Sequence, residues 1–194
     1  MSTLKLIVGL GNPGPSYIET RHNAGQWFVE ELARRYSITL KPESKFFGLY
    51  GEGLIEGVKV RLLIPTTFMN KSGQAVAAVC KFYKIEADEY LVAHDELDFE
   101  PGIVRLKTGG GHGGHNGLRD IFAKTANKKD FHRLRIGIGH PGDAKLVSSW
   151  VLKKAPLADH QKIVSCVEES TRYMREIVQG DWAAAMNQLH QFKA

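Results

Sequence analysis

Apolar segments of strand length alternate with amphipathic segments of helix length along this chain of 194 residues. The first, Leu4–Leu10, is apolar except for Lys5 and is bounded by glycine. A helical pattern follows over Gly25–Tyr36, with Asn23 as its expected N-cap. Strands that alternate with helices are typical of a sheet whose faces are covered by helices. The alternation therefore predicts an α/β protein with a mixed sheet.

Further strands and helices continue this pattern toward the end of the chain. Two of the strands flank Glu56-Gly57 and predict a hairpin, and the segment from Pro156 onward predicts two helices that break near Gly180-Asp181. No linker, repeat or low-complexity stretch divides the sequence, so we expect residues 1–194 to form a single domain. The remaining elements expected are the strands Phe46–Ile55, Val58–Ile64, Tyr90–His94, Ile103–Lys107 and His132–Ile138, and the helices Ser72–Lys84 and Gly117–Ala126.

Composition indicates the cellular compartment more clearly than it indicates the binding partner. The net charge is +5, from 26 basic and 21 acidic residues, which suits a polyanionic partner and suits a merely basic enzyme equally well. Cys80 and Cys166 lie in helical, apolar contexts, which favours a reduced interior over a disulfide framework. Because the sequence shows neither a secretory signal nor a membrane-spanning run, we expect a cytoplasmic protein that does not enter the membrane.

The stretch Gly9–Gly14 spells G-x-G-x-x-G directly after a predicted strand, which is the spacing of a dinucleotide-binding turn. In that turn the N–H groups of an immediately following helix hold the pyrophosphate. Here Pro13 and Pro15 remove two N–H groups, and the helical pattern begins only after Asn23. An acidic residue for the ribose is also missing at the end of a second strand. We therefore reject dinucleotide binding.

Polar side chains gather where the predicted strands end. Loops at the carboxyl ends of strands are the usual ligand sites of such sheets. A single histidine or aspartate in a loop is more often structural than catalytic, but four such places in one small domain indicate a site. They are the loop with Asn12, Tyr17, Arg21, His22 and Asn23, the segment Pro65–Asn70, the segment His94-Asp95-Glu96, and the run "TGGGHGGHNGL".

These residue types restrict the chemistry that a site here could perform. No G-x-S-x-G turn is present and neither cysteine lies in such a loop, so a covalent nucleophile is not expected. His112 and His115, with His94 and Asp95, are a candidate metal site, but a glycine-rich loop would not fix the geometry of the ligands and we expect no metal. The alternative is a histidine that activates water, which is the chemistry we favour.

His22, Asp95 and Asn12 suit that chemistry. His22 would act as the general base, Asp95 would orient the imidazole, and the neutral amide of Asn12 would stabilise an oxyanion.

The stretches "GLGNPGPSYIETRHNAG", "PTTFMNKSG", "HDELD", "GGHGGHNGLRD" and "RLRIGIGHPG" resemble, in order and spacing, the signatures of bacterial peptidyl-tRNA hydrolases. The resemblance covers essentially the whole chain. It implies a single-domain three-layer α/β/α sandwich around a mixed, mostly parallel twisted sheet. It also implies a monomer without metal or cofactor, which hydrolyses the ester between a peptide and the 3′-terminal ribose of tRNA and so recycles prematurely released tRNAs. The partner would be peptidyl-tRNA, bound through its acceptor stem and 3′ CCA end.

The resemblance also implies roles for individual residues. His22 would activate water, Asp95 would hold and polarise the imidazole, and Asn12 would position the substrate and the water. Asn70 and Asn116 would line the groove for the peptide and the ribose end, because an amide offers both a donor and an acceptor. Ordinary packing is the alternative for Phe68 and Met69. The further residues placed around the cleft are Tyr17, Phe68, Met69 and His115.

Basic residues on two predicted strands could follow the phosphates of the tRNA. Residues two apart on a strand share a face, so Arg133 pairs with Arg135 and Arg105 pairs with Lys107. Lys124, Lys128 and Lys129 add charge just before the arginine strand. Lys107 and Arg135 match phosphate-binding positions of the family, whereas a solvated surface is the alternative for each cation. The family often has a basic residue directly after "HPGD", but here Ala144 stands in that place and Lys145 follows.

Two other functions are compatible with parts of this sequence. A non-catalytic RNA-binding protein would need the basic strands but not the pair His22 and Asp95, and a hydrolase of another ester would need the pair but not the basic strands. The sequence has both the basic strands and the pair His22 and Asp95, which favours an enzyme that hydrolyses an ester linked to RNA.

Overall fold

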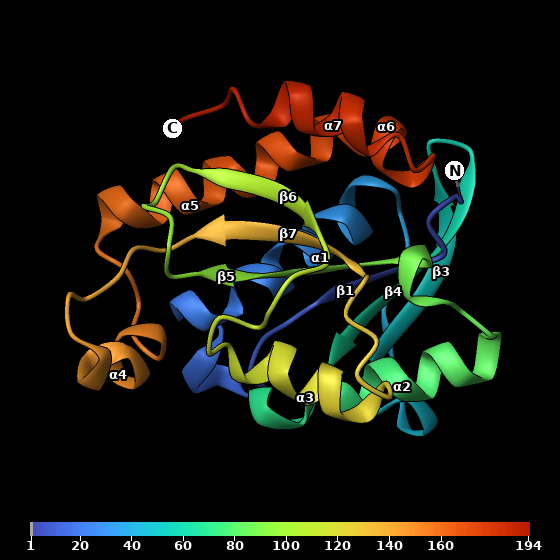
Figure 1. Ribbon diagram of the computed structural model, residues 1–194, viewed down its shortest axis with the longest axis horizontal. Helices are drawn as coiled ribbons and strands as arrows, with labels where there is room; N and C mark the ends of the chain where they lie inside the picture. The colour runs from blue at the N-terminus through green and yellow to red at the C-terminus, as the bar shows by residue number, and fades with distance from the viewer. Residues whose placement is uncertain (1) are drawn as a thin grey trace.

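The computed structural model describes residues 2–194, and within them the strands form one seven-stranded sheet in the order β2-β3-β4-β1-β5-β7-β6 (Figure 1). The strands are β1 (Leu6–Gly9), β2 (Lys41–Glu43), β3 (Gly48–Ile55), β4 (Val58–Pro65), β5 (Tyr90–Glu96), β6 (Val104–Thr108) and β7 (His132–Gly137).

The sheet is parallel in its centre and antiparallel at both edges. Strands β4, β1, β5 and β7 run parallel, whereas β2, β3 and β4 form an antiparallel meander and β6 runs against β7. The predicted hairpin is present, because Ile55 pairs with Val58 around Glu56 and Gly57. Both turn residues have positive φ, at 48° and 79°, as a tight hairpin turn requires. This arrangement confirms the α/β class and the mixed sheet.

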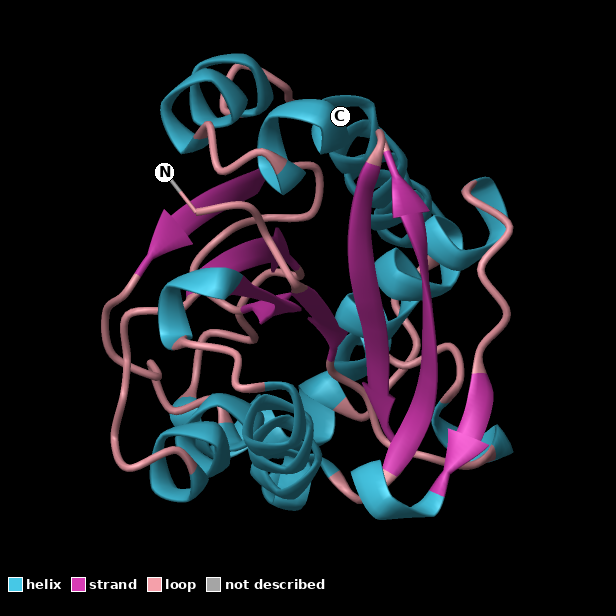
Figure 2. Ribbon diagram, turned by 90° about the vertical axis from the view of Figure 1, so that its right-hand side faces the viewer, coloured by secondary structure: helices cyan, strands magenta, loops and turns pink. Residues whose placement is uncertain are grey.

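Helices cover both faces of the sheet, which makes three layers (Figure 2). Alternate residues of β1 enter two separate cores: Ile7 packs with α1 and the C-terminal helices, and Leu6 and Val8 pack with α2 and α3. The three-layer sandwich implied by the resemblance is therefore confirmed. The helices are α1 (Ala24–Arg35), α2 (Ser72–Tyr83), α3 (Asn116–Lys124), α4 (Val147–Val151), α5 (Leu157–Ser170), α6 (Met174–Val178) and α7 (Trp182–Leu189). No helix within residues 2–194 is long and apolar enough to span a membrane.

The prediction of two C-terminal helices is wrong, because α5, α6 and α7 occupy that segment. The expected break lies between α6 and α7, where Gly180 has a φ of 76° and Asp181 caps α7 through Ala184 N–H. A further break, a 3₁₀ turn over Thr171–Tyr173, separates α5 from α6. The sequence also did not predict β2 or α4, because three and five residues are too few to show a periodic pattern.

Asn23 occupies the N-cap position of α1 as predicted, but its side chain makes no capping hydrogen bond within residues 2–194, because a 3₁₀ turn, Arg21–Asn23, runs straight into the helix. Its side chain instead joins both backbone groups of Asn12, accepting from the N–H at 2.8 Å and donating to the carbonyl oxygen at 3.0 Å. The N–H of Gln26 near the start of α1 donates to the Leu10 carbonyl oxygen. The loop after β1 and the start of α1 are thereby tied together.

Gly25 allows α1 to lie directly on the end of β5. A Cβ atom at this position would lie 2.0 Å from the carbonyl oxygen of Ala93. The close approach places the preceding turn, with His22, beside the carboxyl end of β5, where the polar residues of that strand begin.

Candidate active site

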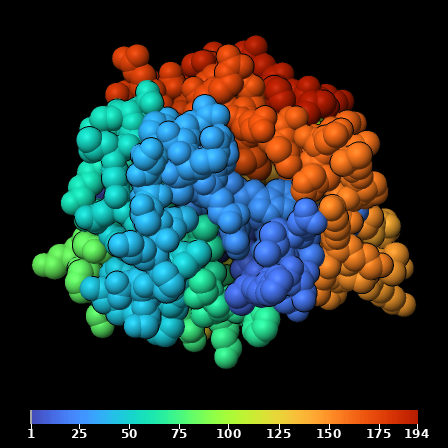
Figure 3. Space-filling view, turned by 180° about the vertical axis from the view of Figure 1, so that it is seen from behind, coloured from blue at the N-terminus to red at the C-terminus, as the bar shows by residue number. Residues whose placement is uncertain are grey.

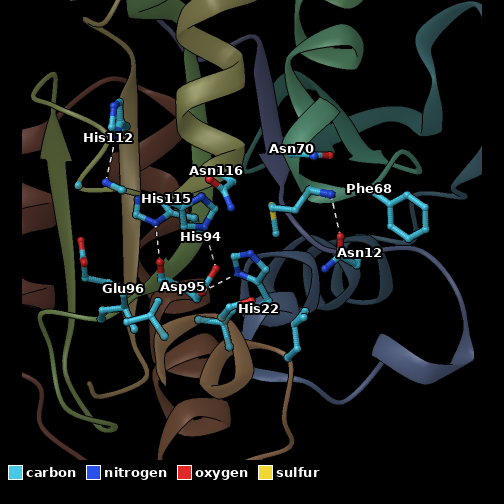
Figure 4. A pocket seen from close by; sticks show the side chains of 18 of the residues that line it. Asn12, His22, Phe68, Asn70, His94, Asp95, Glu96, His112, His115 and Asn116 are labelled. Atoms are coloured by element: carbon cyan, nitrogen blue, oxygen red, sulfur yellow. Dashed lines mark hydrogen bonds and ion pairs between the residues drawn. The ribbon is translucent and has the colours of Figure 1, made fainter. Parts of the chain in front are cut away.

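A cleft of about 450 Å³ opens at the carboxyl ends of the central strands (Figure 4). It brings together most of the residues predicted for the site, from loops far apart in the sequence. Those that line it are Asn12, Tyr17, His22, Phe68, Met69, Asn70, Asp95, His115 and Asn116. Lys107 and Arg135 lie instead in a neighbouring hollow of about 220 Å³, which shares His94, Glu96, His112 and Gly113 with the cleft.

Asp95 lies at the centre of the polar groups, buried at the end of β5. One of its carboxylate oxygens is 2.8 Å from Nδ1 of His22 and the other is 2.8 Å from Nε2 of His115. Burial opposes a charge on this carboxylate, but the two histidines hold its pKa well below the usual range. Asp95 therefore stays ionised and accepts from both rings.

The contacts of His115 fix where its proton lies. Its Nδ1 accepts from the N–H groups of Gly117 and Leu118, at 3.1 and 3.3 Å, and so caps the first turn of α3. A nitrogen that accepts carries no proton, so the proton of neutral His115 is on Nε2 and is donated to Asp95. Neither nitrogen is left to take a proton from water.

Within residues 2–194, His22 has one nitrogen engaged and one free. Its Nδ1–H donates to Asp95, so Nε2 is an unprotonated acceptor in the cleft. Burial alone would lower the pKa of His22, but the charge of Asp95 and its hydrogen bond outweigh this and raise the pKa above the ordinary imidazole value. Of the two rings on Asp95, His22 is the one that can act as a general base.

His94 is the third histidine of the cluster and does not share this property. Its Nδ1 donates to the Asp95 backbone oxygen at 2.8 Å, and its buried Nε2 meets no partner in the part of the chain that the structure describes. Burial lowers the pKa of His94 to about 3. This ring stays neutral and lies beneath the site, in T-shaped contact with His115 at 5.1 Å between ring centroids.

Asn12 presents an amide of fixed orientation beside His22 (Figure 4). Its Oδ1 accepts from the backbone N–H of Met69 at 2.7 Å. The acceptor of the amide is thereby used, and Nδ2 is the group left for a ligand. Met69 is only 4% exposed and packs in the core with residues of α2 and α3. It also lines the cleft, so it serves both the core and the site.

The metal site considered from the sequence is not the cluster that the fold assembles. His112 lies apart, with Nδ1 accepting from Gly114 N–H, whereas His22, Asp95 and His115 have ligand atoms within 4.8 Å of one another. A metal on Nε2 of His115 would move its proton to Nδ1, where two N–H groups already donate. The donor set therefore suits a hydrogen-bonded triad better than a metal.

A family model described as peptidyl-tRNA hydrolase matches residues 6–194 of this chain. The chain belongs to the peptidyl-tRNA hydrolase family. It is 62% identical over 192 residues to the peptidyl-tRNA hydrolase of Colwellia psychrerythraea, covering 99% of each chain. It is 57% identical over 194 residues to that of Shewanella denitrificans, with full coverage of both. The crystal structure of the peptidyl-tRNA hydrolase from Acinetobacter baumannii superposes with a TM-score of 0.96 at 55% identity, covering 100% of this chain and 97% of that one.

The basic strands of this peptidyl-tRNA hydrolase family member carry the cations on one face, as predicted. Arg105 pairs with Arg135 and Lys107 with Arg133 across the antiparallel strands β6 and β7. Lys107 is exposed, and Arg135 forms an ion pair with Glu96 at 2.9 Å.

Arg133, in contrast, does not follow the prediction of a cation open to phosphate. It is 2% exposed, and its guanidinium donates to the carbonyl oxygens of Gly110, Gly111 and Lys129. Burial lowers its pKa to about 10. Arg133 therefore holds the glycine-rich loop in place.

One wall of the cleft was not predicted from the sequence. Val147, Ser148, Val151 and Leu152 of the α4 segment line the cleft together with the residues predicted for the site. Ala144 also lines it, whereas the exposed Lys145 does not, so the shift by one residue after "HPGD" places the lysine outside the cleft. No signal in the sequence marks this wall, because α4 is short and its role depends on tertiary contacts.

The pKa values of the histidines test this geometry directly. By NMR titration of the ring resonances, we expect His22 to titrate above 6.5, because the Asp95 charge favours its protonated form, and His94 to remain neutral down to about pH 3. Asp95→Asn should lower the His22 pKa. Asp98→Asn, which removes a nearby exposed charge without a contact to His22, is the matched control and should leave it within about 0.3 of wild type. A His22 pKa unchanged by Asp95→Asn would contradict the assignment.

Proposed function

We propose that this protein hydrolyses the ester bond that joins a peptide to the 3′-terminal ribose of tRNA; its relatives carry the name peptidyl-tRNA hydrolase. The observation that carries the proposal is the free Nε2 of His22, held by Asp95 in a cleft beside the amide of Asn12. Ester hydrolysis requires a base for water and a donor for the oxyanion, and these groups supply both.

Each of the three residues has a defined part in the reaction. His22 Nε2 removes a proton from water as the water oxygen bonds to the ester carbonyl carbon. Asn12 Nδ2 donates to the oxygen that becomes negative, and Asp95 stabilises the imidazolium that forms. The tetrahedral intermediate then collapses, the bond to the ribose oxygen breaks, and the His22 proton is transferred to that oxygen. The products are a free peptide acid and a tRNA with its terminal hydroxyl restored.

The rim of the cleft offers groups for the peptide and the ribose. The rings of Tyr17 and Phe68 lie edge to face, with 6.4 Å between their centroids, and form an aromatic side of the cleft. Phe68 is 59% exposed. Asn70 and Asn116 are exposed on the rim, and Asn116 Oδ1 accepts from Arg119 at 2.9 Å, which directs its amide nitrogen to a ligand. His115 acts through Asp95 and is a positioning residue.

We further propose that Lys107 and Arg135 bind phosphates of the acceptor stem. Their hollow adjoins the cleft, so an RNA end that enters the cleft would bring its backbone past these cations. The single chain supplies every group named for the reaction, which supports action as a monomer. The free thiols Cys80 and Cys166 support a reducing compartment, the cytoplasm.

The substrate class is tested with N-acetylated and free aminoacyl-tRNA, each with and without EDTA. We expect the blocked substrate to be cleaved and the free one to be largely spared, because the neutral amides of Asn70 and Asn116 on the rim suit a peptide bond better than a charged α-amino group. Cleavage should be unaffected by the chelator. Loss of activity in EDTA would restore the metal alternative, binding without cleavage would favour an RNA-binding protein, and cleavage of simple esters alone would favour another hydrolase.

The catalytic pair is tested by single-turnover hydrolysis of the blocked substrate. His22→Ala should lower the rate about 100- to 10,000-fold while tRNA affinity persists, because the base acts in the transition state and does not contact phosphate. His160→Ala, a histidine of α5 outside the cleft, is the control. Asp95→Asn should lower the rate about tenfold or more, and less than His22→Ala does.

The dependence of the hydrolysis rate on pH tests the pair His22 and Asp95 in a second, independent way. Because protonated His22 cannot accept a proton, the wild-type rate should fall as the pH drops below its raised pKa. In Asp95→Asn this acid limb should move to lower pH. Near wild-type turnover in His22→Ala would show that another group is the base.

The phosphate contacts are tested by the salt dependence of tRNA affinity. Lys107→Ala and Arg135→Ala should each raise KM more than they lower kcat, and should make the log–log salt slope shallower by about 0.7 to 0.9. Lys59→Ala, which removes an exposed charge on the distant hairpin, should leave the slope unchanged. Asn12→Ala should lower turnover without changing the slope. Unchanged slopes for both cation variants would assign these residues to the solvated surface.

A further inference from the structure

We infer that Arg21 is a positioning residue that holds the α4 wall of the cleft and thereby sets the affinity for the peptide end of the substrate. The inference rests on the proposed function, since the peptide is what that wall would contact. It concerns a residue that takes no part in the chemistry and lies next to the general base.

Arg21 and His22 are neighbours in one 3₁₀ turn but point to different places. His22 reaches Asp95 in the cleft, whereas Arg21 is 4% exposed and lies against the end of α4. Figure 3 shows the segments that carry these residues, the blue N-terminal part and the orange part near residue 150, packed side by side on the surface.

The contact between Arg21 and α4 is extensive for a single side chain. The guanidinium carbon lies 3.6 Å from the centroid of the Trp150 ring, and Nη1 donates to the carbonyl oxygens of Trp150 at 2.9 Å and Lys153 at 3.4 Å. The backbone N–H of Arg21 donates to Lys153 as well, at 3.1 Å. These are carbonyls at the carboxyl end of α4, where a cation is favoured.

The α4 wall depends on such contacts because it has little stability of its own. Five residues make barely more than one helical turn, and a helix of this length does not persist without tertiary packing. Trp150 and the buried Val151 anchor the segment to the core, and Trp150 Nε1 donates to Gly139 at 2.9 Å. Arg21 stacks on the same Trp150, so its loss would loosen the anchor from which Val147 and Leu152 extend into the cleft.

An arginine is suited to this contact in a way that a lysine is not. The planar guanidinium stacks on the indole with its face while its edge donates to two carbonyls, and an ammonium group cannot do both. The partners of Arg21 are a ring and carbonyl oxygens rather than a carboxylate. The charge of Asp159 favours the charged guanidinium from a distance, and the stacking and the two carbonyl hydrogen bonds fix where it lies.

Steady-state kinetics on N-acetylaminoacyl-tRNA test the inference through the split between KM and kcat. Arg21→Lys should raise KM about 3- to 30-fold, the range expected from loss of a buried cation–π contact, with kcat within about twofold of wild type. Arg34→Lys, an exposed arginine of α1, is the matched control and should change neither value. A purely structural role would instead lower kcat through loss of active enzyme and leave KM unchanged, which would overturn the inference.

Hydrogen exchange of the backbone amides of residues 144–153 provides a readout without substrate. Exchange there should be faster in Arg21→Lys and in Trp150→Leu than in wild type, and the double variant should be no faster than the faster single one, because both changes break one contact. Additive effects, or exchange equal to wild type in Arg21→Lys, would overturn the inference. Wild-type protein that fails to cleave the blocked substrate would overturn the proposed function instead, whatever the exchange result.

Discussion

The organisation of the site depends on the two hydrogen bonds that the carboxylate of Asp95 accepts. A buried carboxylate is strongly unfavourable unless its oxygens are hydrogen-bonded, and here each oxygen accepts from a different ring at 2.8 Å. The two rings come from the turn before α1 and from the residue that caps α3. One side chain at the end of β5 therefore links a loop, a helix start and the centre of the sheet, and it fixes His22 and His115 relative to one another.

Two histidines bound to the same carboxylate differ in the contacts of their second ring nitrogen. His22 and His115 both donate to Asp95, and their rings lie 5.0 Å apart. They differ in the second nitrogen, because that of His115 accepts two backbone N–H groups and that of His22 remains free. The capping of α3 therefore distinguishes the two rings, whereas the carboxylate accepts from both at the same distance.

Much of the fold and of the site could be predicted from the sequence, because both depend on local patterns. The buried strands show as apolar runs, and polar residues directly after them, such as Asp95, must lie at one edge of a parallel sheet. What the sequence could not show is the direction of side chains that depends on distant contacts. Asn23 bridges Asn12 instead of capping α1, and Arg133 turns inward to three carbonyls although it shares a strand face with Arg135. The sequence of the α4 segment shows no pattern that would predict this wall of the cleft.

The two sides of the cleft differ in how they are held. The side with Asn12 and Asp95 continues directly from β1 and β5, so its geometry is that of the sheet. The α4 side is a short segment held by side chains such as Arg21 and by the backbone N–H of Arg21, which donates to Lys153. Because Arg21 and His22 are consecutive, one turn contacts α4 through Arg21 and Asp95 through His22. The 2.8 Å hydrogen bond of His22 to Asp95 ties the same turn to the sheet side, so the turn Arg21–Asn23 joins the two sides of the cleft.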